Sequence, residues 1–209
     1  MSKDEKQSGL SRRDFMKGLG VGVIGSSALL SSITKCTPEK PGPHGSVIRG
    51  PGLETIVLTI NGSKMVLKVE PRVTLLDALR DRLGFTGTKR VCNRGQCGAC
   101  TIIMNGQTIL SCSMLAVDAD GAEIETVEGL AEGDRLHPVQ ESFVKHDAMQ
   151  CGFCTPGFIM SSVALLRANK NPSLEEIKEG VCGNLCRCGT YPHIFSAVDE
   201  AAKKMRKGG

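Results

Sequence analysis

The spacing of the cysteines restricts this chain more than any other feature of its sequence. Ten cysteines occur among 209 residues, and eight of them fall into two groups of four. The first group has the spacing C-x4-C-x2-C-x11-C, and the second consists of two close pairs, C-x2-C and C-x-C. In chain order the eight are Cys92, Cys97, Cys100, Cys112, Cys151, Cys154, Cys186 and Cys188. Thiols this close together predict two tightly cross-linked or metal-bound segments.

The first group has the cysteine arrangement of a plant-type [2Fe–2S] ferredoxin, in which the fourth ligand comes from a later segment. Gly95 and Gly98 lie inside the loop, where glycine permits unusual dihedrals and adds no side chain against the inorganic sulfides. Backbone N–H groups of such a loop are expected to point at the sulfurs. A structural zinc ion and disulfides are the alternatives. Zinc sites typically have two C-x2-C knuckles, so the four-residue gap after Cys92 favours a cluster.

Residues 54–69 predict a β-hairpin. Two alternating, β-branched runs flank Asn61-Gly62, which is a favoured two-residue turn. Thr74 can cap a short helix over residues 75–83. A second hairpin is expected around Asn105-Gly106, just before Cys112. The first cysteine group is therefore expected in a domain built mainly of β-strands.

Four helices are expected around the second cysteine group. Thr155 as N-cap and Pro156 at the first helical position open the second of them. A capping box of Ser173 and Glu176 opens the third. The predicted helices cover residues 137–146, 155–169, from 174 onward, and 192–204.

The second group's two pairs stand where helices begin. If the helices pack as an antiparallel bundle, the pairs would meet at helix N-termini. There, N–H groups and positive dipole ends suit an anionic cluster. The pair Cys186-x-Cys188 is rare in zinc sites and geometrically difficult for a disulfide. A second cluster is therefore the favoured interpretation.

These motifs resemble those of a known family. The loop 92–112, Gln-Cys-Gly-Phe-Cys-Thr-Pro-Gly at 150–157 and Gly-Asn-Leu-Cys-Arg-Cys at 183–188 are similar to the small iron–sulfur subunit of the xanthine oxidase family of molybdenum hydroxylases. The resemblance covers about residues 53–204. It implies an α+β fold, with an N-terminal β-grasp 2Fe-2S ferredoxin domain at 53–129 and a C-terminal four-helix-bundle 2Fe-2S domain at 130–209.

The resemblance also implies the cofactors and the role of each site residue. The first four cysteines would bind an outer [2Fe–2S] cluster and the second four an inner cluster, nearest the molybdenum cofactor of a large partner subunit. Gln150 would contact the pterin of that cofactor. The partner would oxidise an aldehyde or N-heterocycle, and electrons would pass through both clusters to an FAD subunit or a c-type cytochrome. The chain would not be catalytic on its own.

Two features depart from the family pattern. The family often reads Thr-Gly-Tyr after its last ligand, whereas this chain has Gly189-Thr190-Tyr191. That order resembles the isoquinoline and aldehyde oxidoreductase branches and disfavours a purine substrate. Cys182 is an additional cysteine, which we expect to be a small buried residue and not a ligand.

The first 52 residues have the features of a targeting segment and a linker. Arg12-Arg13 precede an uncharged stretch, residues 18–34, which is shorter and less apolar than the roughly 20 residues of a membrane span. This predicts a twin-arginine signal over 1–36, a linker over 37–52 and a periplasmic location. A lipid anchor at Cys36 is an alternative, although Lys35 fits a lipoprotein box poorly. The twin-arginine route carries folded proteins, so it is compatible with clusters inserted before export.

Charge and composition exclude a nucleic-acid-binding function. Residues 1–52 hold eight basic and four acidic residues, and the rest of the chain holds 18 of each, so the net charge of +4 belongs to the leader and linker. A protein that lacks a basic patch and interleaved aromatic side chains is not expected to bind nucleic acid. Two competing functions remain: a stand-alone two-cluster ferredoxin, and a structural zinc or disulfide protein of the cell envelope.

Overall fold

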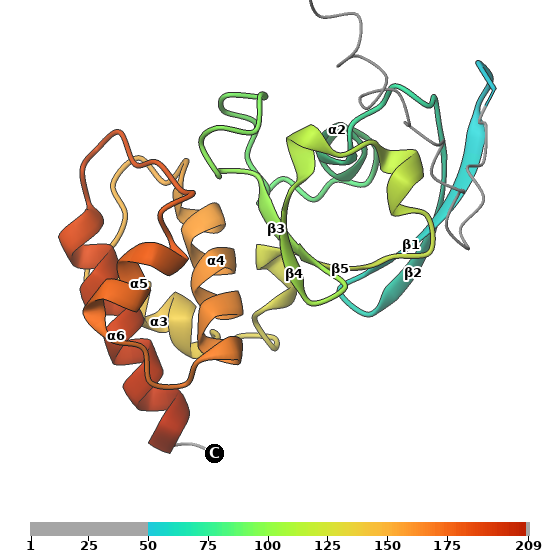
Figure 1. Ribbon diagram of the computed structural model, residues 1–209. Helices are drawn as coiled ribbons and strands as arrows, with labels where there is room; N and C mark the ends of the chain where they lie inside the picture. Colours follow the sequence, from blue (N-terminus) through green and yellow to red (C-terminus); the bar gives the residue numbers. More distant parts are fainter. Residues whose placement is uncertain (1–49, 208–209) are drawn as a thin grey trace, which may run out of the picture. The chain divides into compact units, whose positions relative to one another are not determined.

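The computed structural model describes residues 50–207, which lie within one compact unit. The predicted signal at 1–36, the lipid anchor at Cys36 and almost all of the predicted linker lie outside the described residues. The described part has an α+β fold, with a five-stranded sheet followed by four helices (Figure 1). Among residues 50–207, no helix combines the length and apolarity needed to cross a membrane.

Two hairpins provide four of the five strands, as predicted. Strands β1 (Glu54–Ile60) and β2 (Ser63–Val69) are antiparallel, and so are β3 (Thr101–Met104) and β4 (Gln107–Leu110). Each hairpin turns through an Asn-Gly pair in which both residues have positive φ, as a type I′ turn requires.

The fifth strand joins the two hairpins into one sheet. Strand β5 (Glu123–Glu125) runs parallel to β1 and antiparallel to β3, which gives the strand order β2-β1-β5-β3-β4. Ile124 at its centre is fully buried. The sequence does not predict β5, because three residues are too few to show a strand's alternation.

A short helix packs against the sheet. Helix α2 (Leu75–Asp77) is capped by Thr74, whose hydroxyl accepts a hydrogen bond from the N–H of Asp77 at 3.1 Å. It continues as one π-helical turn, Ala78–Arg82, and not as the regular helix expected over 75–83. The sheet and this helix share a core of aliphatic side chains, which includes Ile56, Leu58, Ile60, Leu75, Leu79, Ile102 and Ile124.

The predicted four helices are all present. They are α3 (Pro138–Lys145), α4 (Thr155–Ala168), α5 (Leu174–Gly180) and α6 (Tyr191–Lys207). The capping box at Ser173 is confirmed. Thr155 is not the N-cap of α4 but its first residue, so the helix begins one residue earlier than predicted, with Cys154 at the cap position. Phe143, Phe158 and Met160 are the largest side chains buried at their centre.

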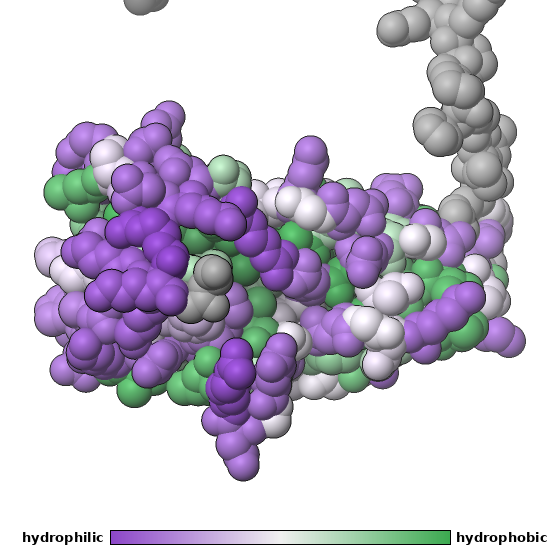
Figure 2. All heavy atoms as spheres, turned by 90° about the horizontal axis from the view of Figure 1, so that it is seen from below, coloured by the Kyte–Doolittle hydropathy of each residue, from purple (hydrophilic) through white to green (hydrophobic). Residues whose placement is uncertain are grey.

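Hydrogen bonds between helix ends show the relative directions of the four helices. The Nδ1 atom of His193, near the start of α6, lies 2.8 Å from the carbonyl oxygen of His146, just after α3. At the other end of α6, Arg206 donates to the carbonyl of Lys170, between α4 and α5. Neighbouring helices are therefore antiparallel, and the starts of α4 and α6 lie at the same end of the bundle. Hydrophilic side chains cover most of the helical face in Figure 2.

Helix α4 connects the bundle to the sheet. It packs on β3 and β4 (Figure 1), and the guanidinium of Arg167 donates two hydrogen bonds, each 2.7 Å, to the carboxylate of Glu125 in β5. This bidentate pair lowers the pKa of Glu125, chiefly through the hydrogen bonds from Arg167. The cysteine-bearing segments of both parts are thus held on one scaffold.

Candidate metal centres

The β3–β4 hairpin brings the last two cysteines of the first group together. Cys100 lies just before β3, and Cys112 lies in a single helical turn after β4. Both are buried. Ser111 reinforces the closure, because its hydroxyl donates to the carbonyl oxygen of Cys100 at 2.8 Å. The gap between these two cysteines is therefore the length of one short hairpin.

The loop before β3 points its backbone at the sulfurs, as expected. The N–H of Arg94 donates to Cys92 Sγ at 3.4 Å, and the N–H of Gly95 donates to Cys112 Sγ at 3.2 Å. Gly95 has φ +69°, and a Cβ on it would lie 2.6 Å from the Ser113 hydroxyl. The loop can therefore take this path only with glycine at that position.

The same backbone donors affect the acidity of the thiols. Burial raises the pKa of Cys92, but hydrogen bonds from the N–H groups of Arg94 and the residues after it outweigh that effect and lower the pKa to about 6. Cys100 is different: burial raises its pKa to about 11. Backbone donors stabilise the thiolate, which is the form of cysteine that binds metals.

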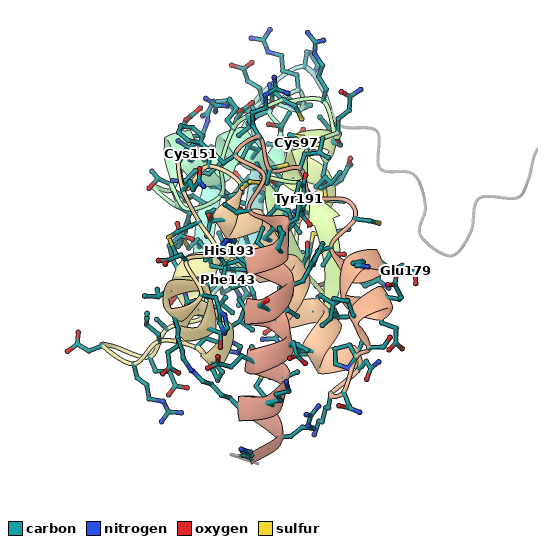
Figure 3. All side chains as sticks on the ribbon, turned by 90° about the vertical axis from the view of Figure 1, so that its left-hand side faces the viewer. Cys97, Phe143, Cys151, Glu179, Tyr191 and His193 are labelled. Carbon is teal, nitrogen blue, oxygen red and sulfur yellow. The ribbon has the colours of Figure 1, made fainter. Side chains whose placement is uncertain are left out.

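The second group is assembled at the starts of α4 and α6. Cys154 and Cys186 are buried, their side chains hydrogen-bond to each other, and Cys151 and Cys188 are exposed. Cys186 is held from two directions: its N–H donates to the Tyr191 hydroxyl at 2.8 Å, and its Sγ lies 3.1 Å from Thr190 Oγ1. Tyr191 begins α6, at the end of that helix where Cys151 is also labelled (Figure 3).

The two buried thiols of the second group, Cys154 and Cys186, differ in acidity. Burial, followed by the bond to Cys186, raises the pKa of Cys154 to about 12. Burial also opposes ionisation of Cys186, but hydrogen bonds from Thr190 outweigh it and lower that pKa to about 7.

The paired thiols fit [2Fe–2S] clusters. Such a cluster takes four cysteine thiolates, two on each iron. The structure brings Cys92 close to Cys97, Cys100 close to Cys112 and Cys154 close to Cys186. Within residues 50–207, no three Cys, His, Asp or Glu side chains converge on a single point as a lone metal ion would need, and all nine cysteines there are free thiols.

A buried hydroxyl beside the second group also supports a cluster there. Thr155 Oγ1 is buried next to Cys154 and has no hydrogen-bond partner among the described residues. A buried hydroxyl without a partner is costly. A cluster sulfur is an acceptor that would satisfy it, so the residues present fit the cofactor.

Comparison with known proteins agrees with this geometry. Residues 58–131 match the family of 2Fe-2S iron-sulfur cluster binding domains, and residues 126–199 match the [2Fe-2S] binding domain family. The aldehyde oxidoreductase iron-sulfur-binding subunit of Escherichia coli K12 is 40% identical, covering 94% of this chain and 90% of that protein. The chain belongs to the iron–sulfur subunits of the molybdenum hydroxylases.

Two further members of this family extend the comparison. The nicotine 6-hydroxylase small subunit of Paenarthrobacter nicotinovorans is 49% identical, covering 70% of this chain and 88% of that subunit. A chain of quinoline 2-oxidoreductase from Pseudomonas putida 86 superposes with a TM-score of 0.72 at 47% identity, covering 75% of this chain and 98% of that one. As an iron–sulfur subunit, the chain transfers electrons and is not catalytic on its own.

The expectation that Cys182 is buried is also wrong. Cys182 is exposed, not buried. Val181 occupies the buried position after α5, and Cys182 follows in the turn beyond it. There it lines a hollow of about 340 Å³, together with Gly95, Gln96 and Asn184.

Two residues that hold the second site were not identified from sequence. Tyr191 stands in the sequence only as part of a motif, yet its hydroxyl accepts the hydrogen bond from the Cys186 N–H. Asn184 is buried and contacts the loop of the first group, 86 residues away in sequence. The sequence shows only that Asn184 lies in the Gly-Asn-Leu-Cys-Arg-Cys motif, two residues before a predicted ligand.

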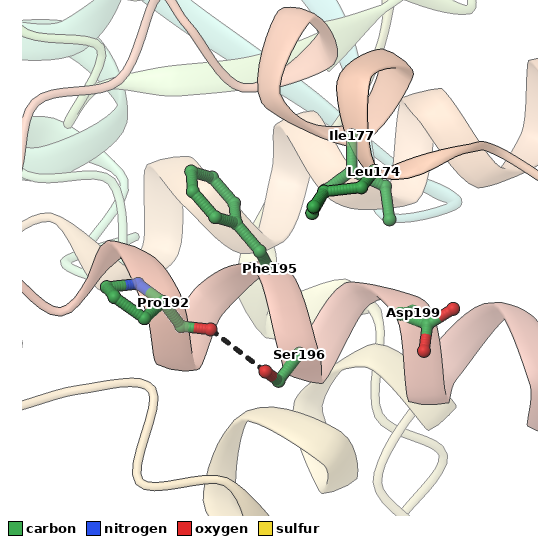
Figure 4. A pocket seen from close by; sticks show the side chains of 6 residues that line it. All are labelled: Leu174, Ile177, Pro192, Phe195, Ser196 and Asp199. Carbon is green, nitrogen blue, oxygen red and sulfur yellow. Dashed lines mark hydrogen bonds between the residues drawn. The ribbon is translucent and has the colours of Figure 1, made fainter.

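A separate hollow of about 480 Å³ lies between α5 and α6. Leu174, Ile177, Phe195 and Asp199 are among the residues that line it (Figure 4). Its Ser196 hydroxyl is already used, since it donates to the Pro192 carbonyl at 3.0 Å. No cysteine lines this hollow, so it is not part of either centre.

Proposed function

We propose that this subunit relays single electrons from the molybdenum cofactor of a large partner subunit, through an inner and then an outer [2Fe–2S] cluster, to a further redox protein. The observation that carries the proposal is the presence of two sets of paired thiols on one scaffold, joined by direct contacts. The outer cluster would be bound by Cys92, Cys97, Cys100 and Cys112. The inner cluster would be bound by Cys151, Cys154, Cys186 and Cys188.

The residues of this chain hold the clusters and set their electrostatic environment. When bound, each cluster accepts and releases one electron at a time. The N–H groups of Arg94 and Gly95, and the hydroxyl of Thr190, face cysteine sulfurs and can stabilise the negative charge added on reduction. Burial of Cys100, Cys112, Cys154 and Cys186 keeps water from these sulfurs.

The surface beside the second group supports a large molybdenum partner. Gln150 and Cys151 are exposed in the same loop. Three apolar side chains each directly precede one of these residues or a cysteine of the group: Met149 precedes Gln150, Phe153 precedes Cys154 and Leu185 precedes Cys186. They are 37%, 59% and 55% exposed. Apolar and aromatic side chains are typical of interface cores. The Gln150 amide can both donate and accept, so we assign it the contact to the pterin across this interface.

The named relatives indicate the substrate class. The Escherichia coli relative is an aldehyde oxidoreductase subunit, and the other two belong to enzymes named for nicotine and quinoline. The proposed substrate of the partner is therefore an aldehyde or N-heterocycle. An FAD subunit or a c-type cytochrome is the proposed acceptor.

The proposal includes the domain bounds and the location. Residues 53–129 would form the ferredoxin domain and residues 130–209 the helical domain. Residues 1–36 would direct export by the twin-arginine route, and the assembled complex would work in the periplasm. Export of the folded protein would allow clusters loaded in the cytoplasm to be retained.

The test is metal analysis and EPR of the full chain purified with its bound partners. Two [2Fe–2S] centres require about four irons per chain, two distinct signals after dithionite reduction, and a Mo(V) signal from the partner. Two cluster signals without a molybdenum partner would instead indicate a stand-alone ferredoxin. A colourless protein containing zinc would overturn the proposal.

A further inference from the structure

The segments that carry the two cysteine groups meet through a single backbone hydrogen bond. The N–H of Leu185 donates to the carbonyl oxygen of Cys97 at 2.9 Å. Cys97 belongs to the first group, and Leu185 is bonded directly to Cys186 of the second. A continuous path of covalent bonds and one hydrogen bond therefore runs from one group to the other.

A buried asparagine holds this meeting point. Asn184 is only 4% exposed. Its Nδ2 donates to the carbonyl oxygen of Gly98 at 2.9 Å, and its Oδ1 accepts from the hydroxyl of Ser161 in α4 at 2.7 Å. One side chain thus ties the outer loop, the inner loop and helix α4 together, with its donor and its acceptor both used.

Two glycines let the segments approach this closely. A Cβ on Gly98 would lie 2.5 Å from Asn184 Nδ2 and from the Gly183 carbonyl oxygen. A Cβ on Gly157 in α4 would overlap the Gly98 carbonyl oxygen. Backbone packing of this kind leaves no space for a side chain, so the position of Asn184 also fixes the separation of the two loops.

Resting on the proposed function, we infer that Asn184 is a positioning residue for electron transfer between the clusters. In that step one electron leaves the inner cluster, which is oxidised, and enters the outer cluster, which is reduced. No bond forms or breaks, and the partner's molybdenum centre supplies the next electron. Electron tunnelling slows steeply with distance and is slower across a gap than along bonds. Asn184 speeds the step by keeping the Cys97–Leu185 contact closed.

The experiment compares Asn184→Ala and Ser161→Ala with wild type in the full complex. Ser161→Ala keeps the asparagine but removes the hydroxyl that orients it. Ser162→Ala is the matched control, because Ser162 is also buried in α4 but donates to the Phe158 carbonyl within its own helix. Each protein is first checked for iron content and for both EPR signals.

Two measurements then report on the contact. One is the magnetic interaction between the two reduced clusters, which depends on their separation. The other is the rate at which an oxidised outer cluster is reduced by the inner cluster, followed by freeze-quench EPR. Asn184→Ala is expected to weaken the interaction and slow the transfer several-fold with both signals retained. Ser161→Ala should do so less, and Ser162→Ala should match wild type.

The outcomes separate this inference from the proposed function. Wild-type protein that lacks two cluster signals would refute the proposed function itself. With two clusters present, unchanged coupling and transfer in both Asn184→Ala and Ser161→Ala would overturn the positioning role. Loss of a cluster from both variants would also overturn it, because Asn184 would then be needed for binding and not for transfer.

Discussion

The two cysteine groups are held in place by different local structures. The first uses a loop with residues at positive φ, and backbone N–H groups supply the hydrogen bonds to sulfur. The second uses the starts of two helices, and side-chain hydroxyls supply much of the support, from Thr190 to sulfur and from Tyr191 to the backbone of Cys186.

This difference affects how each group tolerates substitution. Backbone donors cannot be removed by changing a side chain, so the first group should be sensitive mainly at its ligands and its glycines. Side-chain partners can be removed one at a time, so the second group should show graded effects. The two groups also lie against separate hydrophobic clusters, which predicts that one can be lost without the other.

The largest expected effect is the loss of one cluster from a ligand variant. Cys112→Ser should abolish the outer signal and reduce iron from about four to about two per chain, since each [2Fe–2S] cluster holds two irons. Cys186→Ser should do the same to the inner signal. Iron analysis and EPR of the reduced proteins check this. Loss of both signals from either variant would show that the two groups do not assemble independently.

The next effect comes from the close approach of helix α4 to the loop of the first group. Gly157→Ala places a methyl group against the Gly98 carbonyl oxygen, and overpacking of this kind typically costs about 1–3 kcal/mol. The midpoint of thermal unfolding should fall accordingly. Gly183→Ala is the control, because a Cβ there meets nothing within 4 Å. Equal midpoints for the two variants would contradict the proposed tight contact.

Features with local causes could be predicted from the sequence. The Asn-Gly turns fixed both hairpins because the turn type demands positive φ at both residues, and the Ser173 capping box marked the start of α5. Cysteine spacing indicated the loop of the first group. In each case the residues that decide the structure are adjacent in the chain.

Features with distant causes could not be predicted. Strand β5 exists because β1 and β3 flank it, and its three residues carry no pattern of their own. The contact of Asn184 with Gly98 spans 86 residues. The exposure of Cys182 depends on which residue after α5 faces the core, and Val181 takes that position. Only tertiary packing decides such points.

A smaller effect is expected from Tyr191→Phe, which should weaken the binding of the inner cluster and leave the outer cluster unchanged. Tyr191→Phe removes the acceptor of the Cys186 N–H, and loss of one such hydrogen bond costs about 1 kcal/mol. The ring contact with Phe158, at 6.0 Å between centroids, can remain. The inner cluster should become easier to extract with a chelator, while the outer signal of the same sample serves as the control. An equal loss of both signals would argue against a local role for Tyr191.

The smallest effect concerns an ion-pair cluster between α3 and α6. The Glu200 carboxylate accepts a hydrogen bond from Lys145 Nζ at 2.8 Å, and its other oxygen lies beside His146 Nε2. The hydrogen bond from Lys145 has the largest effect and that from His146 the next, and they lower the pKa of Glu200 from 4.5 to about 2. A carboxylate with a lowered folded-state pKa stabilises the fold above its unfolded pKa, and this contribution is lost as pH falls toward the folded value.

Glu200→Gln should therefore lower the unfolding midpoint at neutral pH, and its difference from wild type should shrink as the pH falls from about 4.5 toward 3. The pair is partly exposed, so the effect is small and should weaken with salt. Lys145→Gln is the matched variant, since it removes the first partner and leaves His146 and Lys204 in place. It should show part of the same loss. A difference that stays constant down to about pH 3 would mean that Glu200 acts through packing and not through its charge.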